Sequence, residues 1–246
     1  MSGHSKWNNI KHKKEKTDSA RAKVFTKIGK EMAIAVKEGG PDPVSNSKLR
    51  DLIAKAKANN VPNDNIDRVI KKAAGEDGGA NYEVIMYEGY GPCSVAIIVE
   101  ATTDNRNRTA GDVRHFFDKF GGNLGQMGCV SYLFSDKGLI VIDGDDVDEE
   151  ALMDAALEAG AEDIVNNEGT FEVYTDPADF SAVNDALSAK GYSFLSAEQT
   201  KIPANYVDVE GEDNLKFMNK LLEALDDNDD VTNVWHNWNE PDEDEE

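Results

Sequence analysis

The sequence predicts an α+β multidomain protein: an N-terminal three-helix domain followed by two α/β, ferredoxin-like domains, the third inserted in the second. Helical periodicity is confined to about the first 75 of the 246 residues, strand patterns begin after a glycine-rich joint, and one later segment has the order strand–helix–strand–strand–helix–strand. The expected parts are residues 1–77, residues 78–136 together with 201–239, residues 137–200, and an acidic disordered tail at 240–246.

The N-terminal domain is predicted from three amphipathic helices. The first runs from an N-cap at Thr17-Asp18-Ser19 to about residue 38, where Gly39-Gly40-Pro41 stops it. The second ends at Asn59-Asn60, and the third begins at Pro62 and ends at Gly75. Short joints between such helices favour a small bundle, with the lysines and arginines on its outward faces.

The middle domain begins after the linker Glu76-Asp77-Gly78-Gly79. Strands are expected at 82–88, 94–102 and 130–134, with a helix opening at Asp104 and closing at Gly121-Gly122. The loop Gly89-Tyr90-Gly91-Pro92 could cradle a phosphate, but it lacks the GxGxxG spacing and a following GK[ST]. A simple strand connection is the better interpretation.

The inserted domain is predicted from the pattern between residues 137 and 200. Its strands are expected near 139–142, 163–166, 170–174 and 192–197, and its helices near 149–159 and 178–190. That order is typical of a ferredoxin-like sandwich. The following helix around 215–225 and the strand at 231–236 have no sheet of their own, so we expect them to complete the sheet of the middle domain.

Charge is strongly segregated along the chain. Residues 1–75 contain 17 of the 26 Lys and Arg and 8 of the 48 Asp and Glu, a net charge of +9. The remaining residues contain 9 basic and 40 acidic side chains, a net charge of −31, and the whole chain carries −22. This polarity predicts a phosphate-facing surface at the amino end.

The opening segment, residues 3–16, combines five lysines with two histidines and Trp7. Lysines at this density repel one another, whereas a polyanion gains from all of them by releasing condensed counterions. Trp7 and the histidines add stacking surfaces. A solvated basic tail is the alternative, and nucleic-acid contact is favoured over it.

The segment Asn105-Arg106-Asn107-Arg108-Thr109 is a second candidate. Guanidinium groups beside an unpaired helix N-terminus suit phosphate or a base edge. Equally, Asp104 or Asn105 could cap the helix while the arginines pair with nearby acids. The sequence leaves both open.

Signatures of enzymes, metals and membranes are missing. No serine elbow, Walker loop, HExxH or calcium loop is found, and His4, His12, His115 and His236 are scattered. Cys93 and Cys129 form no CxxC pair, which suits a reducing compartment. No apolar run approaches the length of a membrane helix. We expect a cytoplasmic, non-enzymatic protein without metal or cofactor.

Several longer motifs resemble those of the YebC/PmpR family, which includes the mitochondrial translational activator of a cytochrome oxidase subunit. They are GHSKWNNIKHKK at the start, FTKIGKE, YEGYGP, DNRNRT, FGGNLG, LEAGAED and the VWHN near the end. The resemblance covers nearly the whole chain. It implies a three-domain cytoplasmic protein whose basic N-terminal part binds nucleic acid, either as a transcriptional regulator on DNA or as a ribosome-associated factor that helps translation of proline-rich stretches.

The leading hypothesis is therefore a non-enzymatic nucleic-acid-binding regulator of gene expression, with DNA or ribosomal RNA and the ribosome as partners. The alternative is a small-molecule sensor or protein adapter that uses the ferredoxin-like domains. Predicted nucleic-acid-binding residues are Lys6, Trp7, Lys11, His12, Lys13, Lys14, Lys16, Arg21, Lys23, Arg106 and Arg108.

Overall fold

The structure, a computed structural model, describes residues 18–75, 81–144, 147–167 and 169–241. These residues divide into two compact units. One contains residues 18–134 and 203–241, and the other contains residues 135–202.

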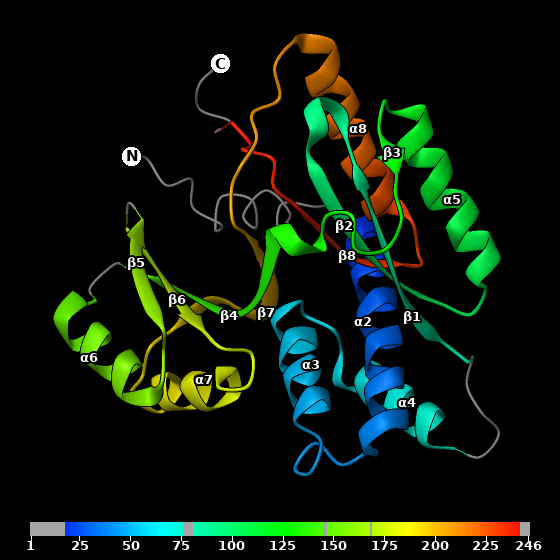
Figure 1. Cartoon of the computed structure of the whole chain (residues 1–246). Helices are drawn as coiled ribbons and strands as arrows, with labels where there is room; N and C mark the ends of the chain where they lie inside the picture. Colours follow the sequence, from blue (N-terminus) through cyan, green and yellow to red (C-terminus); the bar gives the residue numbers. More distant parts are fainter. Residues whose placement is uncertain (1–17, 76–80, 145–146, 168, 242–246) are drawn as a thin grey trace. The chain divides into compact units, whose positions relative to one another are not determined.

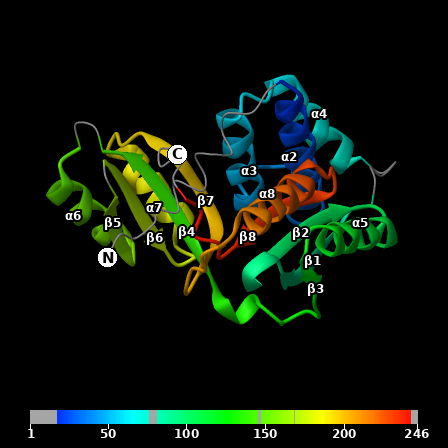
Figure 2. The same cartoon turned by 90° about the horizontal axis from the view of Figure 1, so that it is seen from above.

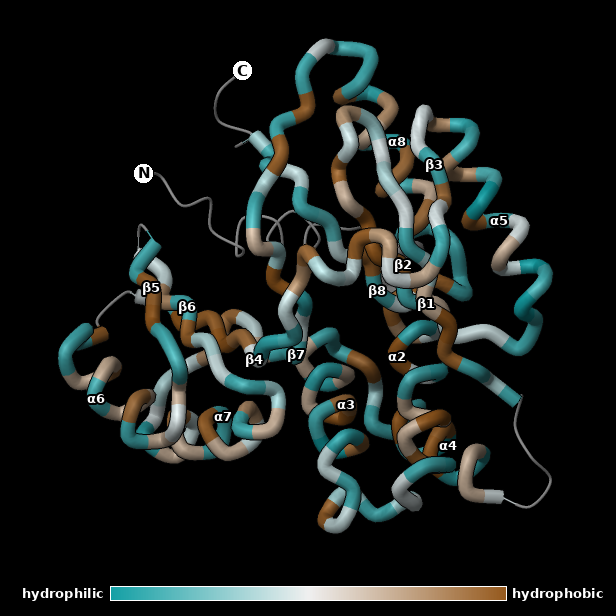
Figure 3. Tube along the Cα trace, in the orientation of Figure 1, coloured by the Kyte–Doolittle hydropathy of each residue, from teal (hydrophilic) through white to brown (hydrophobic). Residues whose placement is uncertain are grey.

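Three helices open the larger unit (Figure 1). They are α2 (Asp18–Gly39), α3 (Ser47–Ala58) and α4 (Asn63–Ala74). Their apolar stripes meet in one core, in which Ile28, Met32, Leu49 and Ala56 are almost completely buried. Figure 3 shows the corresponding alternation of hydrophobic and hydrophilic residues along the helices. Periodicity alone is enough to predict these helices, because each buries one face.

Asn46 fixes the turn between α2 and α3. Its side-chain amide donates to the carbonyl oxygens of Ala35 and Gly40, both at 2.8 Å, and its Oδ1 caps α3 by accepting from Leu49 N at 3.0 Å. A Cβ at Gly39 would meet this side chain at 2.7 Å. The Gly39-Gly40 pair therefore both ends α2 and leaves room for the cap.

The first sheet has the strand order β3-β1-β2-β8. One face carries Ile97 and Val99, which together with the preceding Val95 pack against two helices in a core that includes Phe117 and Leu221. The elements are β1 (Glu83–Tyr90), the 3-10 turn η1 (Pro92–Ser94), β2 (Ala96–Thr103), α5 (Arg106–Lys119), β3 (Asn123–Leu124), the 3-10 turn η2 (Ser131–Leu133), α8 (Glu212–Asp227) and β8 (Val231–His236). Strand β8 pairs with β2 although more than 120 residues separate them, so the last helix and strand do complete this sheet.

The glycine-rich loop after β1 is a strand connection, as expected. It joins β1 to β2 through η1, and Cys93 within it has a positive φ of 55°. Gly89 is required by the neighbouring edge strand, because a Cβ there would lie 2.6 Å from the carbonyl oxygen of Asn123. The close approach allows the short strand β3 to pair with Gly89 and Tyr90.

The strand predicted at 130–134 is wrong. Residues Ser131–Leu133 form the 3-10 turn η2, and only Phe134 belongs to a strand, β4. The backbone N–H groups of Val130 and Ser131 donate to the carboxylate of Glu88, both at 2.9 Å, and are not available to a neighbouring strand. The strand propensity of residues 130–134 is thus overridden by hydrogen bonds to the Glu88 carboxylate, which is distant in sequence.

The second unit is the sandwich predicted for the inserted segment (Figure 2). Its sheet order is β5-β6-β4-β7, and helices α6 and α7 supply buried side chains to its core, among them Leu152 and Leu187. The elements are β4 (Phe134–Asp143), α6 (Glu149–Ala159), β5 (Asp163–Asn167), β6 (Thr170–Thr175), α7 (Phe180–Ala189) and β7 (Phe194–Pro203). The predicted fold class is confirmed: a helical N-terminal region precedes two α+β parts, each with a four-stranded sheet.

Candidate nucleic-acid interface

Most of the predicted interface falls on the N-terminal arm. Its members Lys6, Trp7, Lys11, His12, Lys13, Lys14 and Lys16 lie outside the described residues. Arg21 lies in the first turns of α2, and its side chain is also outside the described set. The role of these eight residues stays a prediction.

Lys23 lies on a face of α2 that is turned toward acidic residues at the end of α8. Its Nζ is 2.8 Å from the Asp227 carboxylate, and this hydrogen bond raises the pKa of Lys23. Both side chains are partly exposed, at 34% and 62%. The pair is therefore at the surface, where such contacts add little stability and can be exchanged for other anions.

The next two lysines on this face are not on the outside of the bundle. Lys27 is 8% exposed and donates to the carbonyl oxygen of Asp226 at 2.6 Å. Lys30 donates to the carbonyl oxygen of Asp229 at 2.7 Å and to the Asp230 carboxylate at 2.8 Å. The expectation that Lys27 and Lys30 face outward is wrong. The C-terminal end of α8 offers carbonyls and carboxylates, which attract cations.

Asp230 is the centre of this contact. Only 5% exposed, it accepts from Lys30 at 2.8 Å, from Thr109 at 2.8 Å and from the Arg108 guanidinium at 2.6 Å. Burial alone would raise the pKa of Asp230, but these donors outweigh burial and lower it to about 2. One ionised carboxylate thus joins α2, the start of α5 and the start of β8.

The two arginines of the DNRNRT segment pair with acids, which was one of the two alternatives. Asn105 caps α5 by accepting from the backbone N–H of Arg108 at 3.1 Å. Arg108 contacts Asp230 and, at 3.0 Å, Asp104, while Arg106 lies 3.2 Å from Glu83. The Arg106 side chain remains 64% exposed. A phosphate contact by Arg106 and Arg108 stays a prediction, and it would compete with these carboxylates.

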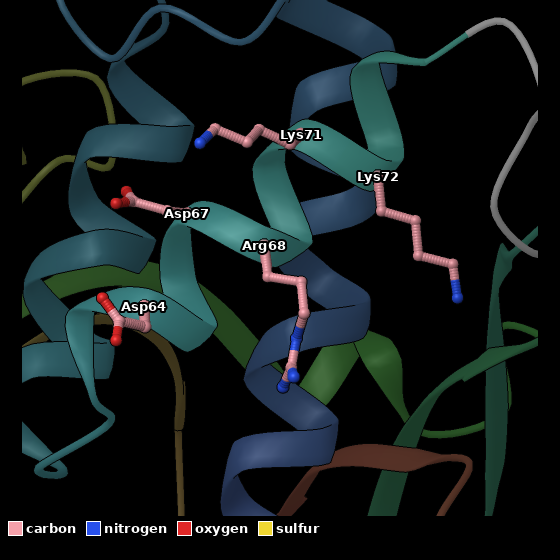
Figure 4. Close-up of a pocket in the computed structure, with 5 residues that line it drawn as sticks. All are labelled: Asp64, Asp67, Arg68, Lys71 and Lys72. Carbon is pink, nitrogen blue, oxygen red and sulfur yellow. The ribbon is translucent and has the colours of Figure 1, made fainter.

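Helix α4 presents cations of a different kind (Figure 4). Arg68, Lys71 and Lys72 line a surface depression of about 540 Å³ together with Asp64 and Asp67. All five side chains are exposed. Within the described part of the chain, no carboxylate pairs with the three cations, and Arg68 donates only to the amide oxygen of Asn65, at 2.8 Å. Asp64 lies in the first turn of the helix and Lys71 and Lys72 lie in the last, as the helix dipole favours.

Three of the four cations of α3, by contrast, lie beside a carboxylate; the fourth, Lys57, is exposed at the end of the helix. Lys48 lies 3.0 Å from Glu38, Lys55 lies 3.5 Å from Glu31, and Arg50 lies 3.9 Å from its neighbour Asp51. Helix α4 is therefore the best candidate for phosphate contact in the described part of the helical region, because three of its cations line one depression and none of them forms an ion pair with a described carboxylate. Sequence reasoning placed Arg68, Lys71 and Lys72 on an outward face but did not single them out, since pairing across helices is invisible in a sequence.

A second depression, of about 690 Å³, bears on the effector hypothesis. Lys30, Arg108, Tyr82 and Phe116 line it, with several aspartates. Both of its cations are already bound to Asp230. A small anionic effector would have to displace that carboxylate, so the depression gives the sensor hypothesis little support.

Two other features are absent from the described residues, a metal site and a membrane-spanning helix. None of these residues form a group of three or more His, Cys, Asp or Glu placed to hold a metal ion. Among the same residues, no helix combines the length and apolar character needed to cross a membrane.

Comparison with known families shows which family this chain belongs to. A model described as "TACO1/YebC protein N-terminal domain" matches residues 5–76, and a model described as "TACO1/YebC second and third domain" matches residues 82–238. The chain belongs to the TACO1/YebC family. The resemblance inferred from the sequence motifs is thereby confirmed.

Relatives of this TACO1/YebC protein align over 97% or more of its length. A "Probable transcriptional regulatory protein" of Ruminiclostridium cellulolyticum is 61% identical over 247 residues, covering 100% of both chains. A protein of the same description from Acetivibrio thermocellus is 59% identical over 97% of this chain and 99% of its own. The crystal structure of the conserved hypothetical protein Aq1575 from Aquifex aeolicus is 45% identical, with a TM-score of 0.85 over 98% of this chain and 100% of that one.

Proposed function

We propose that this protein is a non-enzymatic, nucleic-acid-binding regulator of gene expression that contacts its target through residues 1–77. The observation that carries the proposal is the segregation of charge, +9 in residues 1–75 against −31 in the rest, together with the α4 cations, which pair with no described carboxylate. Such a surface gains affinity for phosphates by releasing counterions. The description of its relatives as transcriptional regulators supports a regulatory role.

Within this function, ribosomal RNA is favoured over a DNA operator. A specific repressor reads base edges with arginine, asparagine and glutamine in the major groove. The exposed cations of α4 are mainly lysines, which position a protein on phosphates without selecting a sequence. Irregular, partly unstacked RNA would also offer bases to Trp7 and the arm histidines.

The proposed target is therefore the ribosome, and the proposed activity is assistance with the translation of difficult, proline-rich stretches. The acidic body supports this choice, since long duplex DNA on either side of an operator would repel a net charge of −31. On the ribosome, magnesium and basic proteins lie close to the RNA and reduce that repulsion.

The test compares the full chain with a variant that lacks residues 1–16. We expect the full chain to co-sediment with ribosomes and the shortened chain to remain in the supernatant, while both bind duplex DNA weakly. Preference for one promoter over scrambled DNA by the roughly thousandfold typical of specific regulators would instead support a DNA operator. No binding to either ribosomes or polynucleotides would refute the proposed function altogether.

A further inference from the structure

One segment of the acidic part of the chain has no charge at all. Residues 120–135 contain no Asp, Glu, Lys or Arg, although such residues make up 30% of the sequence. The segment runs from the end of α5 through β3 and η2 to the start of β4. A polyanion can approach this segment without meeting a carboxylate on it, which is not true of most of the acidic body.

A buried carboxylate fixes the backbone of this segment. Glu88, 5% exposed, accepts from the backbone N–H groups of Gly128 at 2.8 Å, Val130 at 2.9 Å and Ser131 at 2.9 Å. Burial alone would raise the pKa of Glu88, but the three backbone donors lower it. The loop is therefore held in one conformation by an ionised acceptor that is itself hidden from solvent.

The fixed loop presents an exposed aromatic ring. Tyr132 is 72% exposed. Tyr90 holds the same loop by donating to the carbonyl oxygen of Cys129 at 3.1 Å. The Tyr132 side chain thus faces solvent from a loop whose backbone is anchored at Val130 and Ser131. Met127, on the same loop, is 79% exposed.

We propose that Tyr132 is a stacking platform for an unpaired nucleobase, a contact separate from the basic surface of residues 1–77. This inference rests on the proposed function and adds a second contact to it. A ring carried on a backbone that is already anchored loses less conformational entropy when a base stacks on it than a ring on a loose loop does. The segment itself carries no carboxylate that would repel the phosphates of a bound strand.

A nucleobase fits this feature better than a protein partner does. On the loop, Met127 and Tyr132 are the large hydrophobic side chains that the structure shows as exposed. Two side chains are far fewer than the roughly 20–30 residues a side that a stable protein interface uses. They are sufficient for one or two bases, whose flat faces each need a single ring.

The experiment measures binding of the full chain to a fluorescein-labelled single-stranded RNA of about 12 nucleotides, within the site sizes of such proteins, over a range of salt concentrations. Tyr132→Ala removes the ring, and Tyr132→Phe is the matched control that keeps the ring without the hydroxyl. We expect Tyr132→Ala to weaken binding by about 5- to 150-fold, the effect of removing one base stack. Tyr132→Phe should retain most of the affinity.

The salt dependence separates this contact from the charged one. Stacking releases few ions, so the slope of log Kd against log salt should be the same for Tyr132→Ala and the unaltered chain. Equal affinity of Tyr132→Ala and the unaltered chain would overturn the stacking platform while leaving the proposed function intact. Crosslinking of Tyr132 to protein alone on ribosomes would also overturn it. A chain that binds no RNA at all would overturn both.

Discussion

At the scale of single residues, two buried carboxylates organise the larger unit. Asp230 collects donors from three elements that are distant in sequence, and Glu88 collects three backbone donors from one loop. Both are ionised acceptors whose burial is offset by hydrogen bonds. Removing either acceptor leaves buried donors without a partner, which costs more than the bond itself contributes.

The first prediction concerns Asp230 and pH. Its pKa of about 2 in the folded chain lies below the ordinary 3.8, so its contribution to stability is complete above about pH 4 and declines as the pH falls toward 2. The loss should amount to roughly 1–2 kcal/mol, after allowance for solvent around the partly exposed Arg108. Urea unfolding between about pH 2 and pH 7 measures it.

The matched control is one residue away. Asp230→Asn should destabilise the chain at neutral pH and flatten this part of the pH profile. Asp229→Asn should change little, because Asp229 contributes its backbone carbonyl, not its carboxylate, to Lys30. Equal stability of the two variants at neutral pH would show that Asp230 does not organise the contact.

The second prediction concerns Glu88. Glu88→Gln keeps the side-chain shape but replaces one acceptor oxygen with a donor, which then faces backbone N–H groups. We expect a loss of about 1–3 kcal/mol and faster hydrogen exchange at Gly128, Val130 and Ser131. Glu83→Gln, an exposed position on the same strand, should leave those amides protected. Unchanged exchange in Glu88→Gln would contradict the anchoring role.

At the scale of elements, the basic side chains of α2 and those of α4 have different roles. Helix α2 uses Lys27 and Lys30 to hold the end of α8, so these lysines serve structure. Helix α4 carries cations that no described carboxylate neutralises. Both helices are rich in lysine, and their roles differ because acidic groups at the end of α8 and just before β8 lie beside the lysines of α2.

The third prediction tests this division by charge. The triple variant Arg68→Gln, Lys71→Gln, Lys72→Gln should weaken RNA binding and reduce the salt slope by roughly 0.7–0.9 for each phosphate that is no longer neutralised. The control removes the same charge from α3 through Lys48→Gln, Arg50→Gln and Lys55→Gln, where each cation already has a carboxylate partner. If the two triple variants have equal salt slopes, the α4 cations contribute no more to RNA binding than the α3 cations do.

At the scale of the whole molecule, residues 135–202 can be inserted into the chain of the larger unit because the two ends of this segment lie next to each other. Strand β4 enters the second unit and β7 leaves it, and these strands are neighbours in the sheet. Lys201 and Asp136, near the two ends, form an ion pair at 2.5 Å. The first sheet can therefore accept residues 135–202 at one point of its chain without a break in its own pairing.

The fourth prediction follows from that geometry. A fragment of residues 135–202 should fold alone, because its sheet and two helices enclose their own core around Ile140, Leu152 and Leu187. A unit of this size has modest stability, of the order of 3–5 kcal/mol. Thermal unfolding followed by circular dichroism should show one cooperative transition. A non-cooperative melt would mean that the insertion depends on the rest of the chain.

The sequence by itself determined the local elements and the polarity of charge. Helices α2, α3 and α4, the sheet strands around residues 83–103 and the order of the sandwich were predictable, because periodicity and caps act within a few residues. Family membership was also predictable, because the motifs are long and spread over the chain. The tertiary structure decided which polar groups form hydrogen bonds or ion pairs, and with which partners. Lys27 and Lys30 donate hydrogen bonds to residues about 200 positions away in the sequence. Glu88 accepts a hydrogen bond from the backbone of Val130, and the segment predicted as a strand at 130–134 forms a turn instead. Such contacts depend on three-dimensional proximity, so composition and spacing could not separate the lysines that hold the fold from those that remain available to a partner.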